Sequence, residues 1–351
     1  MNQNIKYNLP KGHPVVIYGH KEAKFLVSIV ACISLGLPYI PVDTIYPKER
    51  LHKIINIVNS ALLINTIDDT LDFNKENINT TYYLDDPIIY IIFTSGSTGE
   101  PKGVQITQNS ILDFNKWLDT DFKFSNDSVF MNQAPFSFDL SVYELFFPLS
   151  IGKQIRILPS GLSIPEYITV DSKILINTVP SVIENLVERN VSFKNVAAIN
   201  MAGEPLPIKL SNFLLAYNTE LRNLYGPSED TTYSSCYKIT QKHEQALPIG
   251  KPIDGTQFFI LSEGMSLQSK GIVGEICISG KGLAQGYFNK QDLTDEKFVE
   301  NPFEENSKLY RTGDLGYMDE DGFLWITGRA KDLIIRGGHN IDPAEIEEVL
   351  T

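Results

Sequence analysis

The sequence is poor in cysteine, and the cysteines it has are far apart. Cys32, Cys236 and Cys277 are its three cysteines, and no two of them have CxxC spacing. Such a pattern indicates neither a disulfide framework nor a thiolate zinc site. We expect each cysteine to be a small residue of the core.

Basic clusters and long apolar runs are also missing. The net charge is −13 with no stripe of Lys and Arg, which argues against nucleic acid as a partner, because phosphate backbones are bound by clustered basic side chains. No run approaches the roughly eighteen apolar residues that span a membrane. The start, MNQNIKYNLPKGHP, lacks the basic and apolar regions of a secretory signal. We therefore expect a cytoplasmic protein with no membrane partner.

The sequence does contain an alternation of apolar runs and helical patterns that is typical of α/β folds. A chain of 351 residues exceeds the usual size of one core, so we expect two or three subdomains. HPVVIYG, LPYIPVD and ALLINT alternate with helical segments, and the pattern resumes from KILINTV to ELRNLYG. Later, short strands and turn residues dominate. We predict α/β subdomains over residues 1–240, a β-rich subdomain over 241–328, and a hinge with a helix start over 329–351.

A glycine-rich loop follows one of these strands. The apolar run PIIYIIF leads directly into Thr94-Ser95-Gly96-Ser97-Thr98-Gly99. The glycines let the backbone fold closely around a ligand, while N–H groups and hydroxyls can donate to phosphate oxygens and Lys102 can add a charge. The loop is not a Walker motif, because Pro101 precedes the lysine and a strand follows. Taken alone, it fits a phosphate site and a Ser/Gly-rich surface turn equally well.

Five motifs in order give the chain a family resemblance. FTSGSTGEPKGV resembles the phosphate-binding motif of the adenylate-forming superfamily, which includes acyl-CoA synthetases, luciferases and the adenylation domains of nonribosomal peptide synthetases. NLYGPSED, GEICISGKGLAQGY, YRTGDLGY and GRAKDLIIRGGHNIDPAEIE are similar to its adenine and magnesium, β-subdomain, ribose-binding and hinge motifs. The resemblance covers nearly the whole chain. It implies the fold of the large N-terminal domain of these enzymes, which consists of layered α/β subdomains and an additional small β-barrel-like subdomain.

The resemblance also implies a reaction. In this family a carboxylate attacks the α-phosphate of ATP to give an acyl adenylate and pyrophosphate, and a thiol then displaces AMP. Because one anion attacks another, the first step needs charge neutralisation and in-line positioning. Thr94, Lys102 and Glu229 are the expected catalytic residues, and Glu229 would hold Mg²⁺ through a hard oxygen ligand. The expected phosphate-binding residues are Thr94, Ser95, Gly96, Ser97, Thr98, Gly99 and Lys102.

The remaining ATP-binding residues are expected around adenine and ribose. Tyr225 offers a flat face for adenine, and Asn223 can exchange hydrogen bonds with its amino edge. Asp314 can accept hydrogen bonds from both ribose hydroxyls, and Arg329 can add a donor. The alternatives are a tyrosine that only packs and an aspartate that only supports a turn. The expected lining of the nucleotide pocket is completed by Gly203, Glu204, Pro205 and Gly226.

The stretch NQAPFSFDLSVYELFFPL bears on the acid that is activated. In amino-acid-activating members the Asp of FDxS pairs with the substrate's α-ammonium group, and Asp139 has that position. A desolvated carboxylate beside a carboxylate substrate makes physical sense only with a cation between them. Acyl-CoA synthetases for simple acids lack this Asp, so an amino acid is the favoured substrate. The alternative is that Asp139 caps a helix beginning at LSVYELFF.

The resemblance further implies a side-chain pocket. Asp139, Leu140, Tyr143, Asn177 and Leu224 resemble a pattern seen in cysteine-activating domains, whereas Asn200, Thr232 and Tyr233 do not. Two asparagines and a threonine need hydrogen bonds if they are buried, so we expect a small polar substrate side chain unless water supplies those bonds. The expected pocket residues are Asp139, Leu140, Tyr143, Asn177, Asn200, Ala202, Leu224, Thr232 and Tyr233.

The favoured function has three alternatives. GHPVVIYGHK and NQAPFSFDLSV also resemble D-alanine:carrier-protein ligase, although that family has Cys where this chain has Ala202, which leaves more room. The hinge motif is closer to acyl-CoA synthetases, which favours an acyl- or aryl-CoA ligase. A non-catalytic nucleotide-binding module is the third alternative. The favoured function is activation of an amino acid as aminoacyl-AMP, for thioester transfer to the phosphopantetheine arm of a carrier protein in nonribosomal peptide synthesis.

The end of the sequence falls where the family has a hinge. The resemblance implies a hinge at Asp332, followed by a small C-terminal lid domain with the lysine that neutralises the α-phosphate. The sequence stops within the helix predicted at DPAEIEEVLT. We therefore expect the lid domain to be absent from this chain, which would bind ATP and substrate but turn over slowly.

Overall fold

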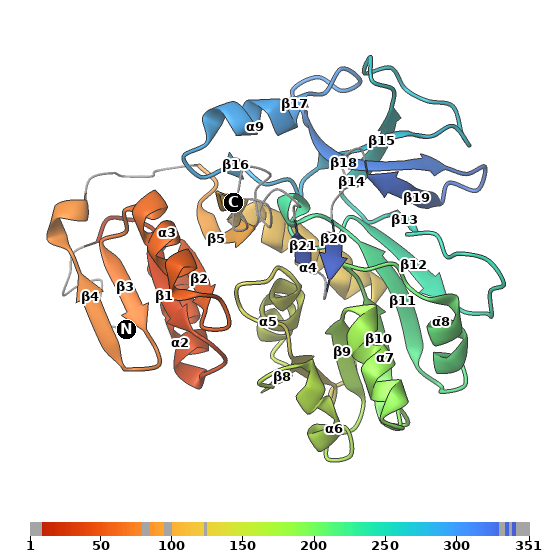
Figure 1. The fold of residues 1–351 in the computed structure, drawn as a ribbon, viewed down its shortest axis with the longest axis horizontal. Helices are drawn as coiled ribbons and strands as arrows, with labels where there is room; N and C mark the ends of the chain where they lie inside the picture. The colour runs from red at the N-terminus through yellow and green to blue at the C-terminus, as the bar shows by residue number, and fades with distance from the viewer. Residues whose placement is uncertain are drawn as a thin grey trace, which may run out of the picture.

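The chain forms two α/β units and a smaller β unit, which Figure 1 shows in red to orange, yellow to green, and teal to blue. The structure is a computed structural model. It describes residues 9–78, 85–94, 100–122 and 125–329, together with the backbone of residues 334–336 and 339–341. The predicted α/β layers and the predicted β-rich part are both present.

The first unit contains a mixed sheet of seven described strands in the order β16-β6-β5-β2-β1-β3-β4. β1 pairs in parallel with β2 and β3, and β2 with β5, whereas β4, β6 and β16 are antiparallel to their neighbours. Two helices connect the parallel strands, as the sequence pattern predicts. The elements are β1 (Val15–Gly19), α2 (Ala23–Ser34), β2 (Tyr39–Asp43), α3 (Lys48–Val58), β3 (Leu62–Asn65), β4 (Thr70–Phe73), η1 (Lys75–Asn77), β5 (Ile88–Thr94), β6 (Lys102–Thr107) and β16 (Gly286–Tyr287).

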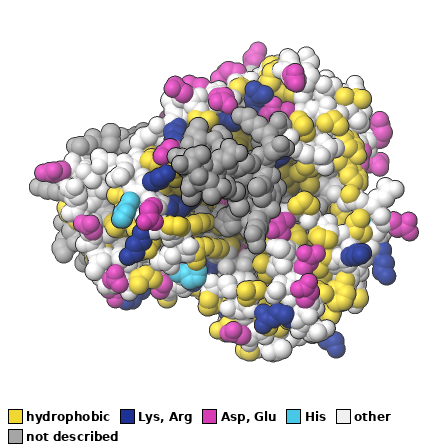
Figure 2. Space-filling model, in the orientation of Figure 1, with side chains coloured by type: hydrophobic (Ala, Val, Ile, Leu, Met, Phe, Trp, Pro, Cys, Tyr) yellow, Lys and Arg dark blue, Asp and Glu magenta, His cyan; other side chains and the backbone are white. Residues whose placement is uncertain are grey.

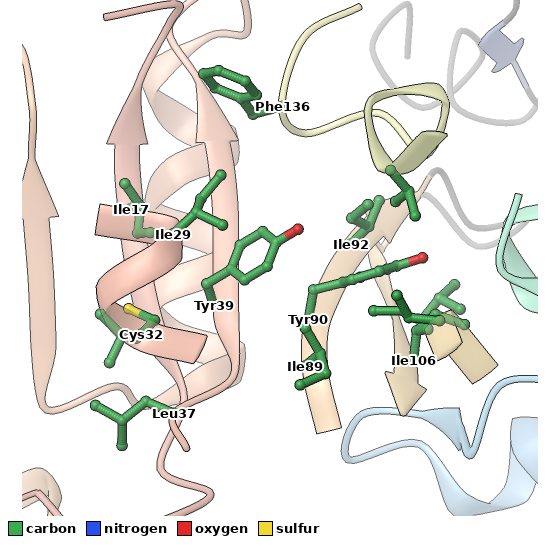
Figure 3. Close-up of a cluster of buried hydrophobic side chains, with 14 of the residues drawn as sticks. Ile17, Ile29, Cys32, Leu37, Tyr39, Ile89, Tyr90, Ile92, Ile106 and Phe136 are labelled. Carbon is green, nitrogen blue, oxygen red and sulfur yellow. The ribbon is translucent and has the colours of Figure 1, made fainter. Parts of the chain in front are cut away.

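The core of the first unit extends to the second unit. Tyr39 of β2 and Tyr90 of β5 are cross-strand partners, with ring centroids 5.9 Å apart (Figure 3). Phe136 belongs to the same core, although it lies on a segment that enters the second unit, and its ring packs against Phe25 with centroids 5.0 Å apart. Such close aromatic packing fixes the segment that carries Phe136.

The second unit contains a sheet with the order β13-β12-β11-β10-β9-β7-β8, which is parallel from β8 to β11. Helices α7 and α8 cover one face of it, and α4 and α5 cover the other, so each face has its own apolar core. The elements are α4 (Gln108–Asp121), β7 (Val129–Asn132), α5 (Leu140–Ser150), β8 (Gln154–Ile157), η2 (Gly161–Ser163), α6 (Ile164–Tyr167), β9 (Ile174–Thr178), α7 (Pro180–Glu188), β10 (Val196–Met201), α8 (Ile208–Leu214), β11 (Glu220–Tyr225), η3 (Ser228–Asp230), β12 (Ser235–Ile239) and β13 (Lys251–Pro252).

The third unit is an antiparallel sheet with the order β14-β15-β18-β17, and β19 pairs with β18. β13 and β16 also come from the segment predicted to be β-rich, but they join the two α/β sheets, so this segment is shared among all three sheets. The elements are β14 (Thr256–Leu261), β15 (Gly274–Gly280), α9 (Gln291–Lys297), β17 (Phe298–Glu300), β18 (Lys308–Met318), β19 (Leu324–Arg329) and the hairpin of β20 (Ile334–Arg336) and β21 (His339–Ile341).

Several expectations from composition can be compared with the described part of the chain. All three cysteines are free; Cys32 and Cys277 are buried as predicted, whereas Cys236 is partly exposed. None of the described helices has both the length and the apolar character needed to cross a bilayer. Figure 2 shows acidic side chains scattered over the described part of one face, with Lys and Arg side chains singly or in small groups between them.

Candidate active site

One short segment joins the predicted nucleotide residues to the predicted acid-binding residue. It begins at Tyr225, where β11 ends, and continues through η3. Ser228 Oγ donates a hydrogen bond to the Asp139 carboxylate, while the next residue, Glu229, pairs with Lys102 at a distance of 2.8 Å. Thr231 has a positive φ of 62°, a strained conformation for a β-branched residue. The segment therefore contains a strained residue, Thr231, close to the point where the two predicted sites meet.

The predicted nucleotide end of the site contains Tyr225, Asp314 and Arg329. The Tyr225 hydroxyl donates to Asp314 Oδ2 at 2.5 Å, and Arg329 Nε lies 2.5 Å from Asp314 Oδ1. Asp314 and Arg329 are register partners on β18 and β19. Burial raises the pKa of Asp314, although Arg329 and Tyr225 both oppose that rise. The three residues predicted from separate motifs are thus brought together around one carboxylate.

The predicted phosphate end of the site is centred on Glu229. Lys102 Nζ and the Tyr287 hydroxyl both donate to Glu229 Oε1, at 2.8 and 2.7 Å. Burial alone would raise the pKa of Glu229, but the Lys102 ammonium and the Tyr287 hydroxyl hold it below the usual value. Thr94 Oγ1 is buried and has no hydrogen-bond partner in the described structure. Ser95, Gly96, Ser97, Thr98 and Gly99 lie outside the described residues, as does Asp332.

Glu229 could bind Mg²⁺ only together with other oxygen ligands, such as the phosphates of a bound nucleotide. The described residues contain no cluster of three or more His, Cys, Asp or Glu side chains that could hold a metal. Mg²⁺ is usually bound by one or two carboxylates together with water and substrate phosphates. A single carboxylate whose pKa is held below its usual value, as that of Glu229 is, fits that donor set.

The predicted acid-binding end of the site is centred on Asp139. This residue has the N-cap position of α5, but its side chain makes no capping hydrogen bond in the described structure. Asp139 is 8% exposed, and its carboxylate accepts a hydrogen bond from Ser228. Burial raises the pKa of Asp139 to about 6, although the hydrogen bond from Ser228 opposes the rise. The described structure thus gives the helix-cap alternative no capping hydrogen bond in its support, and the buried carboxylate is suited to pairing with a cation.

We expect the affinity for an α-ammonium ligand to fall as the pH drops below about 6. Above this pKa the Asp139 carboxylate is ionised, whereas below it the carboxyl group must lose a proton before it can pair, which costs about tenfold in affinity per pH unit. Calorimetric titration of an aminoacyl-sulfamoyl adenosine across the weakly acidic range would measure this slope. The matching ligand without the amino group serves as the control, and an equal slope for both ligands would contradict the prediction.

The predicted side-chain pocket lies between the second sheet and helices α4 and α5. Asn177, Asn200 and Arg222 form one row across β9, β10 and β11, and Ala202 and Leu224 lie on the same face. Leu140 and Tyr143 of α5 and Tyr233 face this row and belong to the same buried cluster. All nine predicted pocket residues are buried: Asp139, Leu140, Tyr143, Asn177, Asn200, Ala202, Leu224, Thr232 and Tyr233.

The buried polar groups of this pocket already have protein partners. The Tyr233 hydroxyl donates to Asn177 Oδ1, and Asn177 Nδ2 donates to the Leu140 carbonyl at 3.2 Å. Thr232 Oγ1 donates to the Asp139 carbonyl at 3.3 Å. The expectation of a polar substrate side chain was based on these groups needing partners. Because the protein supplies those partners, that reason no longer holds, although the Tyr143 hydroxyl faces Asn200 without a well-formed hydrogen bond.

Gly226 is needed for a close approach of two backbone segments. A Cβ atom at this position would lie 2.5 Å from the Thr232 carbonyl oxygen and 2.6 Å from Tyr233 Cα. Backbone atoms cannot rotate away as a flexible side chain could. This glycine therefore lets the segment after Tyr225 lie directly against the residues that lead into β12, which include the pocket residues Thr232 and Tyr233.

We expect Gly226→Ala to lower the free energy of unfolding by about 2 kcal/mol, because overpacking against backbone forces a shift of both segments. Chemical denaturation would measure the change. Gly264→Ala is the matched control, since its Cβ would meet only Ser262 Oγ at an ordinary contact of 3.9 Å. Equal effects of the two substitutions would rule out the close-approach explanation.

The other predicted nucleotide residues are placed less directly. Asn223 is buried and its Nδ2 donates to the Pro248 carbonyl at 2.8 Å, which leaves Oδ1 as the atom that could accept from an adenine amino group. Glu204 accepts hydrogen bonds from the backbone and side chain of Ser181, both at 3.0 Å. Gly203 and Pro205 are exposed. Glu204 thus supports the start of α7, a role that its motif did not indicate.

Three residues of the site were missed by the sequence reasoning. Ser228 and Tyr287 lie inside two of the quoted motifs, but only the structure shows that they contact Asp139 and Glu229. Arg222 is fully buried, lies over the Phe122 ring at 3.6 Å and pairs with Glu220. No sequence signal distinguishes Arg222 from an exposed strand arginine, because its partners are set by the fold.

The sequence comparisons agree with these motifs. The profile of the AMP-binding enzyme family matches residues 5–87 and 80–288. The chain is 34% identical to a linear gramicidin synthase of Brevibacillus parabrevis, over 99% of this chain and 7% of that protein. It is also 34% identical to tyrocidine synthase 3 of the same organism, over 93% of this chain and 5% of that protein. The chain thus spans a small fraction of the length of these relatives.

Solved structures with the same fold include proteins of two kinds. A nonribosomal peptide synthetase protein containing adenylation and PCP domains matches with a TM-score of 0.85 at 25% identity, over 99% of this chain and 64% of that one. An o-succinylbenzoate CoA synthetase from Bacillus subtilis matches with a TM-score of 0.86 at 22% identity, over 99% and 75%. The latter likeness shows the fold alone. On the family match and the ordered motifs, the chain belongs to the AMP-binding enzyme family.

Proposed function

We propose that this chain binds ATP and a small α-amino acid and joins them as aminoacyl-AMP with release of pyrophosphate. The observation that carries the proposal is the segment from Tyr225 to Tyr233. Through Tyr225 it contacts Asp314, the residue assigned to the ribose, and through Ser228 it contacts the buried Asp139. Its own Glu229 pairs with Lys102, the residue assigned to the phosphates. A segment with these three contacts would hold nucleotide and acid next to each other, which is what in-line attack on a phosphate requires.

Each described residue of the site has a role in this proposal. Asp139 pairs with the α-ammonium group and so orients the substrate carboxylate. Lys102 supplies positive charge beside the phosphates, where the attack of one anion on another must be neutralised. Asp314 and Tyr225 hold the ribose and adenine. Mg²⁺, when bound by Glu229 and the ATP phosphates, would supply further charge neutralisation.

A short substrate side chain fits the pocket best. The rings of Tyr143 and Tyr233 have centroids 6.3 Å apart, and Phe114 packs on Tyr233 at 6.0 Å. The Asn177 side chain accepts a hydrogen bond from the Tyr233 hydroxyl and donates one to the Leu140 carbonyl, so it links these two residues. A long or aromatic substrate side chain would have to break these buried hydrogen bonds, each of which contributes about 1 kcal/mol.

The proposal extends to the fate of the adenylate. We propose that the aminoacyl group passes to the phosphopantetheine thiol of a carrier protein, as in nonribosomal peptide synthesis. The support is the similarity to gramicidin and tyrocidine synthases at 34% identity and to a structure that contains adenylation and PCP domains. The acceptor thiol is a separate claim from amino acid activation, and the two can fail independently.

A thermal-shift panel of aminoacyl-sulfamoyl adenosines tests the activation claim, because it requires binding and not turnover. A ligand present at about one hundred times its Kd stabilises the folded state by about 2.7 kcal/mol. We expect ligands with short side chains to shift the melting temperature most and aromatic ones least. Neutral acyl or aryl analogues that shift the protein while aminoacyl ligands do not would indicate a CoA ligase. A shift by AMP alone, with no effect of any acyl group, would indicate a nucleotide-binding module.

A further inference from the structure

The segment that carries Asp139 has no regular secondary structure to fix its conformation. Residues 133–139 join the end of β7 at Asn132 to the start of α5 at Leu140. Ala134, near the start of this segment, is held on both sides. Its N–H donates to Glu144 Oε2 at 3.1 Å, and its carbonyl accepts from Lys21 Nζ at 2.6 Å. Side chains from outside the segment therefore set its shape.

Glu144, a residue of α5, connects the start of this segment to the helix through hydrogen bonds. Its carboxylate accepts hydrogen bonds from Asn132 Nδ2 at 2.7 Å and from Gln133 Nε2 at 3.5 Å, in addition to Ala134. Gln133 Nε2 also donates to the carbonyl of Asn177, a residue of the side-chain pocket. Glu144 is 1% exposed. Burial raises the pKa of its carboxyl group, and the main opposing influence is the charge of Lys21.

Lys21 reaches this segment from the first α/β unit. It follows β1, and the preceding residue, His20, contacts Asp43 at 2.9 Å and the Pro159 carbonyl at 2.9 Å, so two consecutive residues contact the second unit. Lys21 Nζ donates to Asn132 Oδ1 at 2.5 Å and lies 4.4 Å from the centroid of the Phe136 ring. Phe136 is itself buried in the core of the first unit (Figure 3). Both ends of residues 133–136 are thus held across the boundary between the units.

We propose that Lys21 and Glu144 act as a positioning pair that fixes residues 133–139 and thereby places the Asp139 carboxylate for the substrate's α-ammonium group. The inference rests on the proposed function, because it assigns Asp139 that role. Lys21 and Glu144 are linked through Asn132 and Ala134, which both of them contact, and the charge of Lys21 also opposes the rise in the pKa of Glu144. Loss of Lys21 would leave the Ala134 carbonyl and Asn132 Oδ1 without this donor and would remove that charge from the buried Glu144. The segment would then relax, and Asp139, five residues after Ala134, would lose its position.

Lys21→Met in the 351-residue chain tests the pair through two ligands that differ by one group. We expect the Kd of the preferred aminoacyl-sulfamoyl adenosine to rise at least about tenfold, while the Kd of the matching ligand without the amino group stays within about twofold, because only the first ligand uses Asp139. Lys24→Met is the matched control, since Lys24 lies at an exposed position and pairs there with Asp69. A purely structural role would weaken both ligands equally, and that result would overturn the proposal.

Removal of both partners tests whether they act together. Glu144→Gln keeps an oxygen that can accept from Ala134 but removes the buried charge. In the double variant position 144 no longer carries a buried charge that needs Lys21, so we expect amino-group selectivity to recover in part relative to Lys21→Met. Additive losses of amino-group selectivity would contradict the idea that the two residues act together.

Asp139→Asn is measured beside these variants to separate the two claims. If the unmodified chain shows no preference for the ligand with the amino group, the proposed function fails. If the unmodified chain shows this preference, Asp139→Asn loses it and Lys21→Met keeps it, the positioning inference alone fails.

Discussion

Asp139→Asn is expected to weaken binding of the preferred aminoacyl-sulfamoyl adenosine by about 30-fold or more, because removing one partner of a buried charge pair costs about 2–5 kcal/mol. The buried carboxyl group accepts its hydrogen bond from the neutral Ser228 hydroxyl, so its charge is available to a cationic ligand. Asparagine keeps the volume and can still accept the Ser228 hydrogen bond. The loss would therefore come from the charge, which isothermal titration calorimetry measures directly.

Binding of AMP is the internal control for this substitution. The nucleotide residues Tyr225 and Asp314 bind each other and not Asp139 in the described structure, so the Kd of AMP should not change. Asp119→Asn, at an exposed position on α4, is the matched control for an aspartate near the pocket. If Asp139→Asn leaves aminoacyl binding intact, the carboxylate does not pair with an ammonium group, and the amino acid assignment fails with it.

Asp314→Asn should produce the second large effect, on the nucleotide. Hydrogen bonds to a charged group contribute about 1.5–3 kcal/mol, so we expect the Kd of AMP to rise by about 10- to 100-fold. If the carboxylate accepts from the ribose hydroxyls, the unmodified chain should prefer AMP to its 2′,3′-dideoxy analogue. In the variant this preference should disappear. Calorimetric titration of both nucleotides into both proteins gives the coupling between the carboxylate and the hydroxyls.

The alternative for Asp314 is a purely structural one, since it already pairs with Arg329 and accepts from Tyr225. In that case the variant would melt at a lower temperature and bind both nucleotides more weakly by the same factor. Asp321→Asn, on the exposed turn of the same hairpin, provides the matched control. A retained preference for AMP over the dideoxy analogue in Asp314→Asn would contradict the ribose role.

Local patterns predicted much of this structure. The alternation of apolar and helical segments located β1, α2, β2, α3 and β3 in order, because each apolar run is long enough to identify a buried parallel strand. α4 was not predicted, because QNSILDFNKWLDTD carries a weak apolar stripe between polar residues. The sharing of β13 and β16 with the α/β sheets was not predictable either, since strands of two residues carry almost no pattern.

The candidate site likewise contains residues that local motifs predicted and residues whose contacts depend on segments distant in sequence. Tyr225, Asp314 and Arg329 come from separate motifs, and the structure brings them together as expected. The argument for a polar substrate side chain does not hold, because Asn177 and Thr232 have hydrogen-bond partners within the protein. Such partners depend on packing between segments distant in sequence. Lys21, whose partners lie more than one hundred residues away, could not have been found from the sequence for the same reason.

The most direct test of the account is a crystal structure of the chain bound to the aminoacyl-sulfamoyl adenosine that stabilises it most. We predict the ligand's α-ammonium nitrogen at about 3 Å from an Asp139 carboxylate oxygen, a normal distance for a charged hydrogen bond. The ribose hydroxyls should lie at the same distance from Asp314, and the ligand side chain should point toward Asn177 and Tyr143. An ammonium group that faces solvent or another residue, with Asp139 still paired only to Ser228, would contradict the central claim.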